Sequence, residues 1–248
     1  MDKVKYLAGA GNAFAIGENL NIASDIEVIS YVADASVDID GVISISKNLD
    51  SDNTIDMEYY NADGSRAELC LNGVRCSAKY GYDNNIIESK RIYIVTPSGT
   101  ISTNIQEGNV VTSSIEIHNN IEIKEYSLEE FKGYYVNVGN PHFVIETNNL
   151  STINLDEIGT NLQKSDIFPN GINIEFFEKI DDKNISARVY ERGVGETQSC
   201  GSGAIAMYLI LHNFYNLTSN LIVNYPGGKL AIDKNDNIFN LSGQVIYL

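Results

Sequence analysis

The sequence predicts an α+β protein built from two related lobes of predominantly antiparallel sheet. Three observations predict it: many short strand-like segments, only two strongly helical segments, and a set of motifs that occurs twice in the same order. The 248 residues suffice for one large domain or for two smaller ones. The repeated motifs favour two.

The repeat has three landmarks in each half. Gly-Asn comes first, then Cys-x-(Asn/Ser)-Gly, then Pro-(Ser/Gly)-Gly before a strand. In the first half these lie at Asn12, Cys70 and Pro97, and in the second half at Asn140, Cys200 and Pro226. Short glycine-containing strings can coincide by chance among 20 glycines, but the preserved order and spacing favour duplication.

The lobes are expected to meet near residue 119. We assign residues 1–119 to a lobe that carries Cys70, and residues 120–236 to a lobe that carries Cys200. The final strand, 237–248, lies outside both ranges, and its return to the first lobe is left open.

The expected strands are short, rich in Ile, Val and Tyr, and bounded by Gly, Asn or Asp. They are 40–48, 91–97, 113–120, 134–140, 173–179, 185–191 and 221–226. Helical patterning is found mainly in 72–83 and 201–216, directly after the two cysteines. Cys70 and Cys200 are therefore expected in helix N-terminal turns.

Composition excludes several classes of function. The net charge of -16 argues against nucleic acid and anionic membranes as partners, and a small polar substrate remains. No apolar run is long enough to span a membrane and the start does not resemble a signal peptide, so we expect a cytoplasmic protein. Three cysteines without a CxxC pair or clustered His predict neither a disulfide framework nor a metal site, and Cys76 is interpreted as packing.

A cysteine at a helix N-terminus is suited to proton transfer. Unpaired backbone N–H groups and the positive end of the dipole bind a carboxylate and favour thiolate over thiol. Two such turns, one from each lobe, could hold one carboxylate with a thiol on each face of the adjacent carbon. Racemisation at an α-carbon needs such a pair. A free cysteine is otherwise most often a small buried apolar residue, and only the matched contexts favour chemistry here.

At these motifs the chain resembles the diaminopimelate epimerase family. The resemblance rests on YYNADGSRAELCLNGVRCSAKY, VGNPHFVI and VYERGVGETQSCGSGAIA, with weaker support from AGAGNAF, GINIEFFE and YPGGKLAI. It implies two pseudo-symmetric lobes, each a sheet or barrel wrapped around a central helix. It also implies epimerisation between LL- and meso-diaminopimelate, in lysine and peptidoglycan precursor synthesis, without a cofactor.

The resemblance also implies a set of site residues. Cys70 and Cys200 would be the catalytic thiols, with His142 and Glu191 as polar partners that set their protonation. Backbone N–H groups for the reacting carboxylate would come from Leu71, Asn72, Gly201 and Ser202, the last also capping its helix. The far end of the substrate would be held by Asn61, Asn173 and Arg192, with Asn12 and Asn140 nearby.

Some positions depart from the family pattern. Leu71 stands where the family usually has Gly, which predicts backbone strain beside Cys70 if the position needs a positive φ. Ala13 replaces a usual Asp, and Ser36 and Asp38 replace glycines. These departures motivate a second interpretation, a racemase of another amino acid that uses the same thiols.

Other interpretations are a catalytically silent family member acting as a scaffold, and a phenazine-type isomerase. Retention of both Cys70 and Cys200 argues against each. A homodimer is compatible with the sequence.

Overall fold

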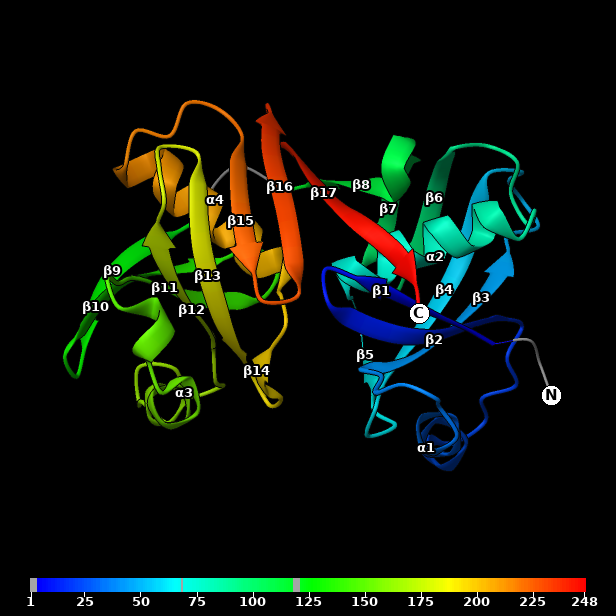
Figure 1. The fold of residues 1–248 in the computed structure, drawn as a ribbon, viewed down its shortest axis with the longest axis horizontal. Helices are drawn as coiled ribbons and strands as arrows, with labels where there is room; N and C mark the ends of the chain where they lie inside the picture. The colour runs from blue at the N-terminus through cyan, green and yellow to red at the C-terminus, as the bar shows by residue number, and fades with distance from the viewer. Residues whose placement is uncertain (1–3, 68, 118–120) are drawn as a thin grey trace. The chain divides into compact units, whose positions relative to one another are not determined.

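The computed structural model describes residues 4–67, 69–117 and 121–248 (Figure 1). The chain forms two compact units. Unit 1 comprises Met1–Ile115 and Ser242–Leu248, and unit 2 comprises Glu116–Leu241. The boundary expected at residue 119 falls among residues 118–120, which lie outside the described residues.

Unit 1 contains two α-helices and nine strands, the last of them shared with unit 2. In chain order these are β1 (Lys5–Gly9), β2 (Asn12–Glu18), α1 (Asp25–Ala33), β3 (Gly41–Lys47), β4 (Thr54–Asn61), β5 (Arg66–Ala67), α2 (Leu71–Asp83), β6 (Arg91–Thr96), β7 (Gly99–Ile105), the short 3₁₀ helix η1 (Glu107–Asn109), β8 (Val110–Glu116) and β17 (Ile238–Tyr247).

Eight of these strands close into a barrel. β1 pairs antiparallel with β2 and with β17, β2 runs parallel to β3, and β3 is antiparallel to β4. β4 runs parallel to β6, and the antiparallel pairs β6–β7 and β7–β8 follow. The pairing of β8 with β17 completes the ring, where the Thr112 and Ser242 hydroxyls lie 2.7 Å apart. The two-residue β5 pairs beside β4.

Helix α2 packs against this barrel from within (Figure 1). It contacts β1, β2, β3, β4, β6 and β7, and ten of its thirteen residues are buried. Close packing requires small residues at some positions. A Cβ at Gly81 would lie 2.3 Å from Cδ1 of Ile55, so glycine lets the strand approach the helix.

Unit 2 has the same order of elements. They are β9 (Ile123–Leu128), β10 (Phe131–Asn137), β11 (Pro141–Glu146), the 3₁₀ helix η2 (Leu150–Thr152), α3 (Leu155–Gln163), β12 (Asn173–Lys179), β13 (Asn184–Glu191), β14 (Gly195–Thr197), α4 (Gly201–Phe214), β15 (Leu221–Tyr225) and β16 (Gly228–Asn235).

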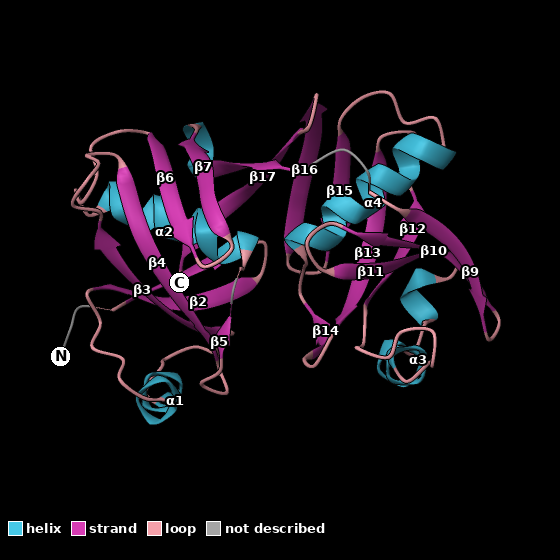
Figure 2. Cartoon of the chain, turned by 180° about the vertical axis from the view of Figure 1, so that it is seen from behind, coloured by secondary structure: helices cyan, strands magenta, loops and turns pink. Residues whose placement is uncertain are grey.

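The pairing pattern repeats as well. β9, β10 and β11 are antiparallel, β11 runs parallel to β12, and β12 is antiparallel to β13. β13 runs parallel to β15, which is antiparallel to β16, and the short β14 pairs beside β13. Helix α4 packs on β10, β11, β12 and β16, with ten of its fourteen residues buried (Figure 2). The predicted fold class is confirmed: two β-rich lobes, mostly antiparallel, each with a central helix.

Two helices were not expected from the sequence. α1 and α3 occupy equivalent places in the two repeats, after β2 and β11, and each has nine residues. α1 begins at a capping box formed by Ser24 and Glu27, and α3 begins after Asn154 with two acidic residues in its first turn. Their helical patterns are too short to stand out by periodicity alone.

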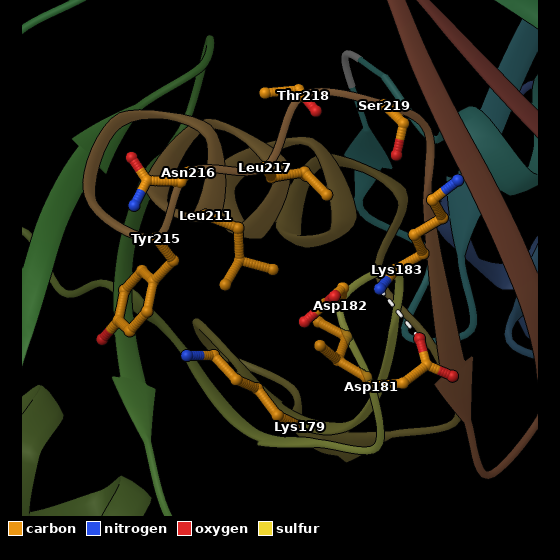
Figure 3. A pocket seen from close by; sticks show the side chains of 11 residues that line it. Lys179, Asp181, Asp182, Lys183, Leu211, Tyr215, Asn216, Leu217, Thr218 and Ser219 are labelled. Carbon is orange, nitrogen blue, oxygen red and sulfur yellow. Dashed lines mark hydrogen bonds between the residues drawn. The ribbon is translucent and has the colours of Figure 1, made fainter.

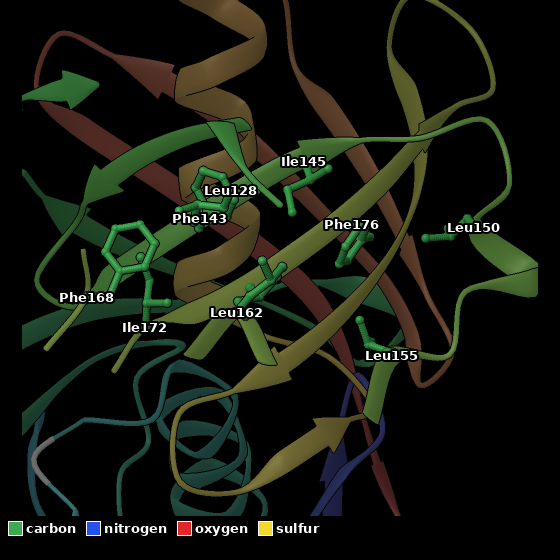
Figure 4. Close-up of a cluster of buried hydrophobic side chains, with 10 residues drawn as sticks. Leu128, Phe143, Ile145, Leu150, Leu155, Leu162, Phe168, Ile172 and Phe176 are labelled. Atoms are coloured by element: carbon green, nitrogen blue, oxygen red, sulfur yellow. The ribbon is translucent and has the colours of Figure 1, made fainter. Parts of the chain in front are cut away.

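Alternation along β11 and β12 separates an entirely apolar face from one that also carries polar side chains. The apolar face packs under α3 in a cluster of buried side chains (Figure 4). The cluster consists of Leu128, Phe143, Ile145, Leu150, Leu155, Leu162, Phe168, Ile172, Ile174 and Phe176. Since side chains alternate, His142 and Glu175 point to the opposite face, where Glu175 meets α4 at Gly203.

Among the described residues no helix is long and apolar enough to cross a membrane.

Phe176 tests the packing of this cluster. Its side chain is fully buried and meets Phe131 edge-on, with ring centroids 5.3 Å apart. Phe176→Ala should lower the free energy of unfolding by about 3–5 kcal/mol, because a large cavity replaces the ring. Leu49, which is 98% exposed, provides the matched control, and Leu49→Ala should change it by less than about 0.5 kcal/mol. Urea unfolding followed by circular dichroism measures both, and equal losses would contradict the packing.

Candidate functional site

Cys70 and Cys200 occupy the same position in the two repeats. Each is the N-cap residue of the central helix of its unit, with φ/ψ of -137°/108° for Cys70 and -131°/119° for Cys200. The helices begin at the next residue, so the cysteines lie at the N-terminal turns as expected. Cys70 is partly exposed and Cys200 is buried.

In unit 1, a chain of polar side chains lies beside Cys70 at the start of α2. Nη2 of Arg75 donates to Oδ1 of Asn72 at 2.5 Å. The Asn72 amide donates to Oδ1 of Asn12, and Asn12 hydrogen-bonds the Asp40 carboxylate. Asp40 also accepts the backbone N–H of Ala13 at 2.7 Å. The side chains of Asn12 and Asn72, which were expected near the substrate, are thus hydrogen-bonded to one another.

Leu71 is accommodated without strain. It is the first residue of α2, its side chain is 6% exposed, and it is absent from the described residues with positive φ. The expectation that this position needs a conformation unsuited to leucine is wrong, because a helical backbone suits any side chain there. Asn61 lies at the end of β4, where its side-chain amide donates to Oγ of Ser65 at 3.0 Å.

In unit 2, His142 and Glu175 form a buried pair on neighbouring parallel strands. Nδ1 of His142 lies 2.7 Å from Oε1 of Glu175, and Nε2 lies 2.9 Å from Oδ1 of Asn140. Both side chains are fully buried. Both ring nitrogens of His142 are therefore held by hydrogen-bonding partners, one on the neighbouring strand β12 and one in the turn before β11.

Cys200 lies within a ring of hydrogen-bonding groups. Its Sγ accepts the backbone N–H of Gly203 at 3.4 Å and lies 3.4 Å from Oγ of Ser202. Glu191 hydrogen-bonds the thiol and accepts the hydroxyl of Thr197 at 2.5 Å. Ser202 was expected to cap α4, but the cap is Cys200 itself, two residues earlier.

The charges around Cys200 favour its neutral form. Burial raises the pKa of the Cys200 thiol well above its ordinary value, and the carboxylates of Glu191 and Glu175 raise it further. Ser202 and the Gly203 N–H oppose this shift. At Cys200, burial and two carboxylates therefore outweigh the helix terminus, which by itself would favour the thiolate. Burial also raises the pKa of Glu191.

Asn173 and Arg192 lie close together in unit 2. Nδ2 of Asn173 donates to the carbonyl of Pro141 at 3.1 Å, and its Oδ1 accepts the backbone N–H of Arg192 at 2.9 Å. Asn173 therefore ties β11 and β12 to the hairpin that precedes Cys200. The Arg192 side chain is exposed and donates to the carbonyl of Asn170 at 3.3 Å.

Two site residues were missed from the sequence. Glu175 is hidden in the apolar strand NIEFFEK, where a charged residue at a buried position was the available signal. Arg75 is fully buried in α2, although arginine is rarely buried without a partner. Within the described ranges no cluster of three or more His, Cys, Asp or Glu side chains is arranged to hold a metal ion.

Unit 2 also has a surface pocket of about 360 Å³ (Figure 3). Of the two lysines that line it, Lys179 lies 3.8 Å from the centroid of the Tyr215 ring and 3.2 Å from Oε1 of Glu146. None of the predicted site residues lines it. We assign it no role.

Comparison with known proteins gives a consistent result. The family model described as "Diaminopimelate epimerase" matches residues 6–115 and 134–245. A diaminopimelate epimerase of Hydrogenobaculum sp. is 34% identical, with 93% of this chain and 91% of the relative covered. That of Methanothermobacter thermautotrophicus is 32% identical, with 80% and 76% covered. These matches confirm the resemblance that the motifs predicted.

Solved structures show the same fold at low identity. A phenazine biosynthesis protein of Bacillus anthracis matches with a TM-score of 0.75 and 15% identity, covering 99% of this chain and 96% of that one. A hydroxyproline epimerase of Agrobacterium vitis matches with a TM-score of 0.72 and 12% identity, covering 99% and 90%.

The charge of Glu191 should control the reactivity of Cys200. Glu191→Gln removes a negative charge beside the thiol, so the pKa of Cys200 should fall. Its labelling rate by methyl methanethiosulfonate near neutral pH should rise about three- to tenfold, which is about 0.5–1 pH unit. Peptide mass spectrometry measures the rate.

The matched control is Glu196→Gln. Glu196 precedes Cys200 by four residues, but its carboxylate pairs with Arg188, 2.7 Å from Nε. This substitution should leave the labelling of Cys200 unchanged. An unchanged or slower rate in Glu191→Gln would contradict the electrostatic assignment.

Proposed function

This chain belongs to the diaminopimelate epimerase family, and we propose that it interconverts LL- and meso-diaminopimelate with Cys70 and Cys200 as the two acid–base groups. It is an isomerase of the epimerase type. The observation that carries the proposal is the matched pair of N-cap cysteines, one in each repeat, with the same backbone conformation. The proposed place of the reaction is the supply of lysine and peptidoglycan precursors.

The proton balance of the proposed reaction closes without a cofactor. One cysteine is a thiolate and removes the α-proton, so an S–H bond forms while the C–H bond breaks. The other is a thiol and delivers its proton to the opposite face of the same carbon, becoming a thiolate. The net charge of the enzyme is unchanged, and only the two thiols exchange roles.

The helix starts would stabilise the reacting carboxylate. The first N–H groups of an α-helix have no intrahelical partner. We propose that those of Leu71 and Asn72 in unit 1, and of Gly201 and Ser202 in unit 2, serve the substrate carboxylate. Such donors stabilise the negative charge that develops on the carboxylate as the α-proton leaves.

In unit 2 the proposed roles of His142 and Glu191 follow from their contacts. Glu191 hydrogen-bonds the Cys200 thiol and so holds its proton toward the carboxylate. His142 lies 2.7 Å from Glu175 and also hydrogen-bonds Asn140, so it fixes the position of the Glu175 carboxyl group that acts on Cys200. Together they let Cys200 rest as the acid of the pair.

Recognition of the far end of the substrate decides between two candidate substrates. We propose that Arg192 grips the distal carboxylate, since its guanidinium is exposed and holds only a carbonyl. Asn61 would assist. Asn173 already uses its amide nitrogen on Pro141 and its amide oxygen on Arg192, and this observation favours the second candidate, a racemase of another amino acid.

Proton exchange in deuterated water tests the proposal. Purified, reduced protein given LL-diaminopimelate should incorporate deuterium at the α-carbon and form the meso isomer, measured by chiral chromatography and mass spectrometry. Cys70→Ser and Cys200→Ser should each lower kcat by about 10²–10⁴-fold, because each removes one acid–base group.

Cys76→Ala is the matched control. Cys76 lies six residues after Cys70 and is fully buried, so this variant should retain activity. If deuterium were incorporated only into another amino acid, that amino acid would replace diaminopimelate as the proposed substrate. The two-thiol mechanism would be retained. Full activity in either serine variant would overturn the two-thiol mechanism.

A further inference from the structure

Arg75 is a buried cation whose role the reaction scheme leaves unexplained. Its side chain is completely buried in the interior of unit 1. Among the described residues it has no carboxylate within salt-bridge distance, and its Nε has no hydrogen-bond partner. Burial lowers the pKa of Arg75 to about 10, so it keeps its charge at neutral pH. A buried charge without a neighbouring counter-ion needs compensation.

The guanidinium is folded back toward the start of α2. Nη1 of Arg75 donates to the carbonyl of Leu71 at 3.3 Å, and Nη2 donates to Asn72 at 2.5 Å. Leu71 and Asn72 are the two residues that follow Cys70. Helical side chains lean toward the N-terminus of their helix, so this direction is the ordinary one. The cationic group therefore lies against the first turn, of which Cys70 is the cap.

Two asparagines fix the guanidinium there. Asn72 accepts from Arg75 and donates to Asn12, and Asn12 in turn hydrogen-bonds Asp40. The nearest carboxylate on this path is thus separated from Arg75 by two neutral amides. The series fixes the position of the positive charge without neutralising it by direct contact.

We infer that Arg75 is a positioning residue that holds negative charge on Sγ of Cys70, so that Cys70 rests as the thiolate and Cys200 as the thiol. Within the described residues, negative charge on Cys76 or on Cys70 would stabilise the charged form of Arg75, Cys76 having the larger effect. Cys76 stays neutral, because burial raises the pKa of its thiol. Cys70, partly exposed at the cap, is the remaining anion.

The other charged groups around α2 are occupied elsewhere. On the helix, Lys79 and Asp83 pair at 2.5 Å near its far end. On the strands, Lys5 of β1 donates to Asn84 beyond the helix. Burial and the nearby Glu18 carboxylate of β2 raise the pKa of Tyr80. Glu58 of β4 pairs with Arg66. Asp40, before β3, reaches Arg75 only through the asparagines.

The contrast with the second repeat supports the assignment. Five residues after Cys200 stands Ile205, where five residues after Cys70 stands Arg75. Cys200 is instead faced by Glu191 and Glu175. One cap thus has a cation behind it and the other has two carboxylates. This inference deepens the proposed function, because it states which thiol begins as base.

Labelling of each cysteine as a function of pH tests the inference in the full chain. Methyl methanethiosulfonate is the probe, and peptide mass spectrometry separates the three cysteines. In the unchanged protein, Cys70 should be labelled with a lower pH midpoint than Cys200. Arg75→Met should raise the midpoint of Cys70 by about one pH unit or more, because the neighbouring positive charge is removed. Arg75→Lys, which keeps the charge, should restore much of the original midpoint.

Arg91→Met is the matched control. It removes one positive charge from the exposed start of β6 in the same unit and should leave the Cys70 midpoint unchanged. A folded Arg75→Met protein with an unchanged midpoint would overturn the inference. If Arg75→Met does not fold, a midpoint of Cys70 above that of Cys200 in the unchanged protein overturns it equally.

Failure of the inference is distinguishable from failure of the proposed function. The labelling uses no substrate, so a shifted midpoint in a protein inactive on diaminopimelate would support the charge assignment and reject the substrate. An Arg75→Met protein that is active on diaminopimelate but keeps the original Cys70 midpoint would support the proposed function and reject the charge assignment.

Discussion

The enclosure of the central helices is the constraint on which the rest of the structure depends. α2 and α4 are buried over ten residues each, so each helix is shielded from water along most of its length. A helix of this kind must be surrounded by other elements, and the strands of each unit supply the cover. Most backbone groups of such a helix are satisfied internally. Its first turn is the exception, and in both units a cysteine is placed there.

Duplication gives one scaffold that carries two different charge patterns. β3 and β12 are equivalent seven-residue strands, and Ile43 of the first stands where Glu175 stands in the second. At the ends of β4 and β13, Asn61 corresponds to Glu191. Backbone geometry is thus retained while side chains diverge. A reaction that needs a base and an acid of the same chemical type is well served by this divergence.

The sequence predicted the strands and central helices because their patterns are strong. Short β-branched segments such as 173–179 and the continuous apolar run after Cys200 match the observed β12 and α4. α1 and α3 were missed because nine residues give too little periodicity. The sequence did not indicate which thiol is ionised, since Glu175 and Glu191 come from different strands and only the fold brings them to Cys200.

The last strand sets the order in which the molecule can be completed during translation. β17 supplies the eighth strand of the first barrel through residues 242–247, of which 245–247 pair with β1 near the other end of the sequence. A ribosome therefore makes all of unit 2 before it makes the piece that closes unit 1. Until β17 is made, the barrel of unit 1 stays open between β1 and β8, although unit 2 already has nearly all its strands.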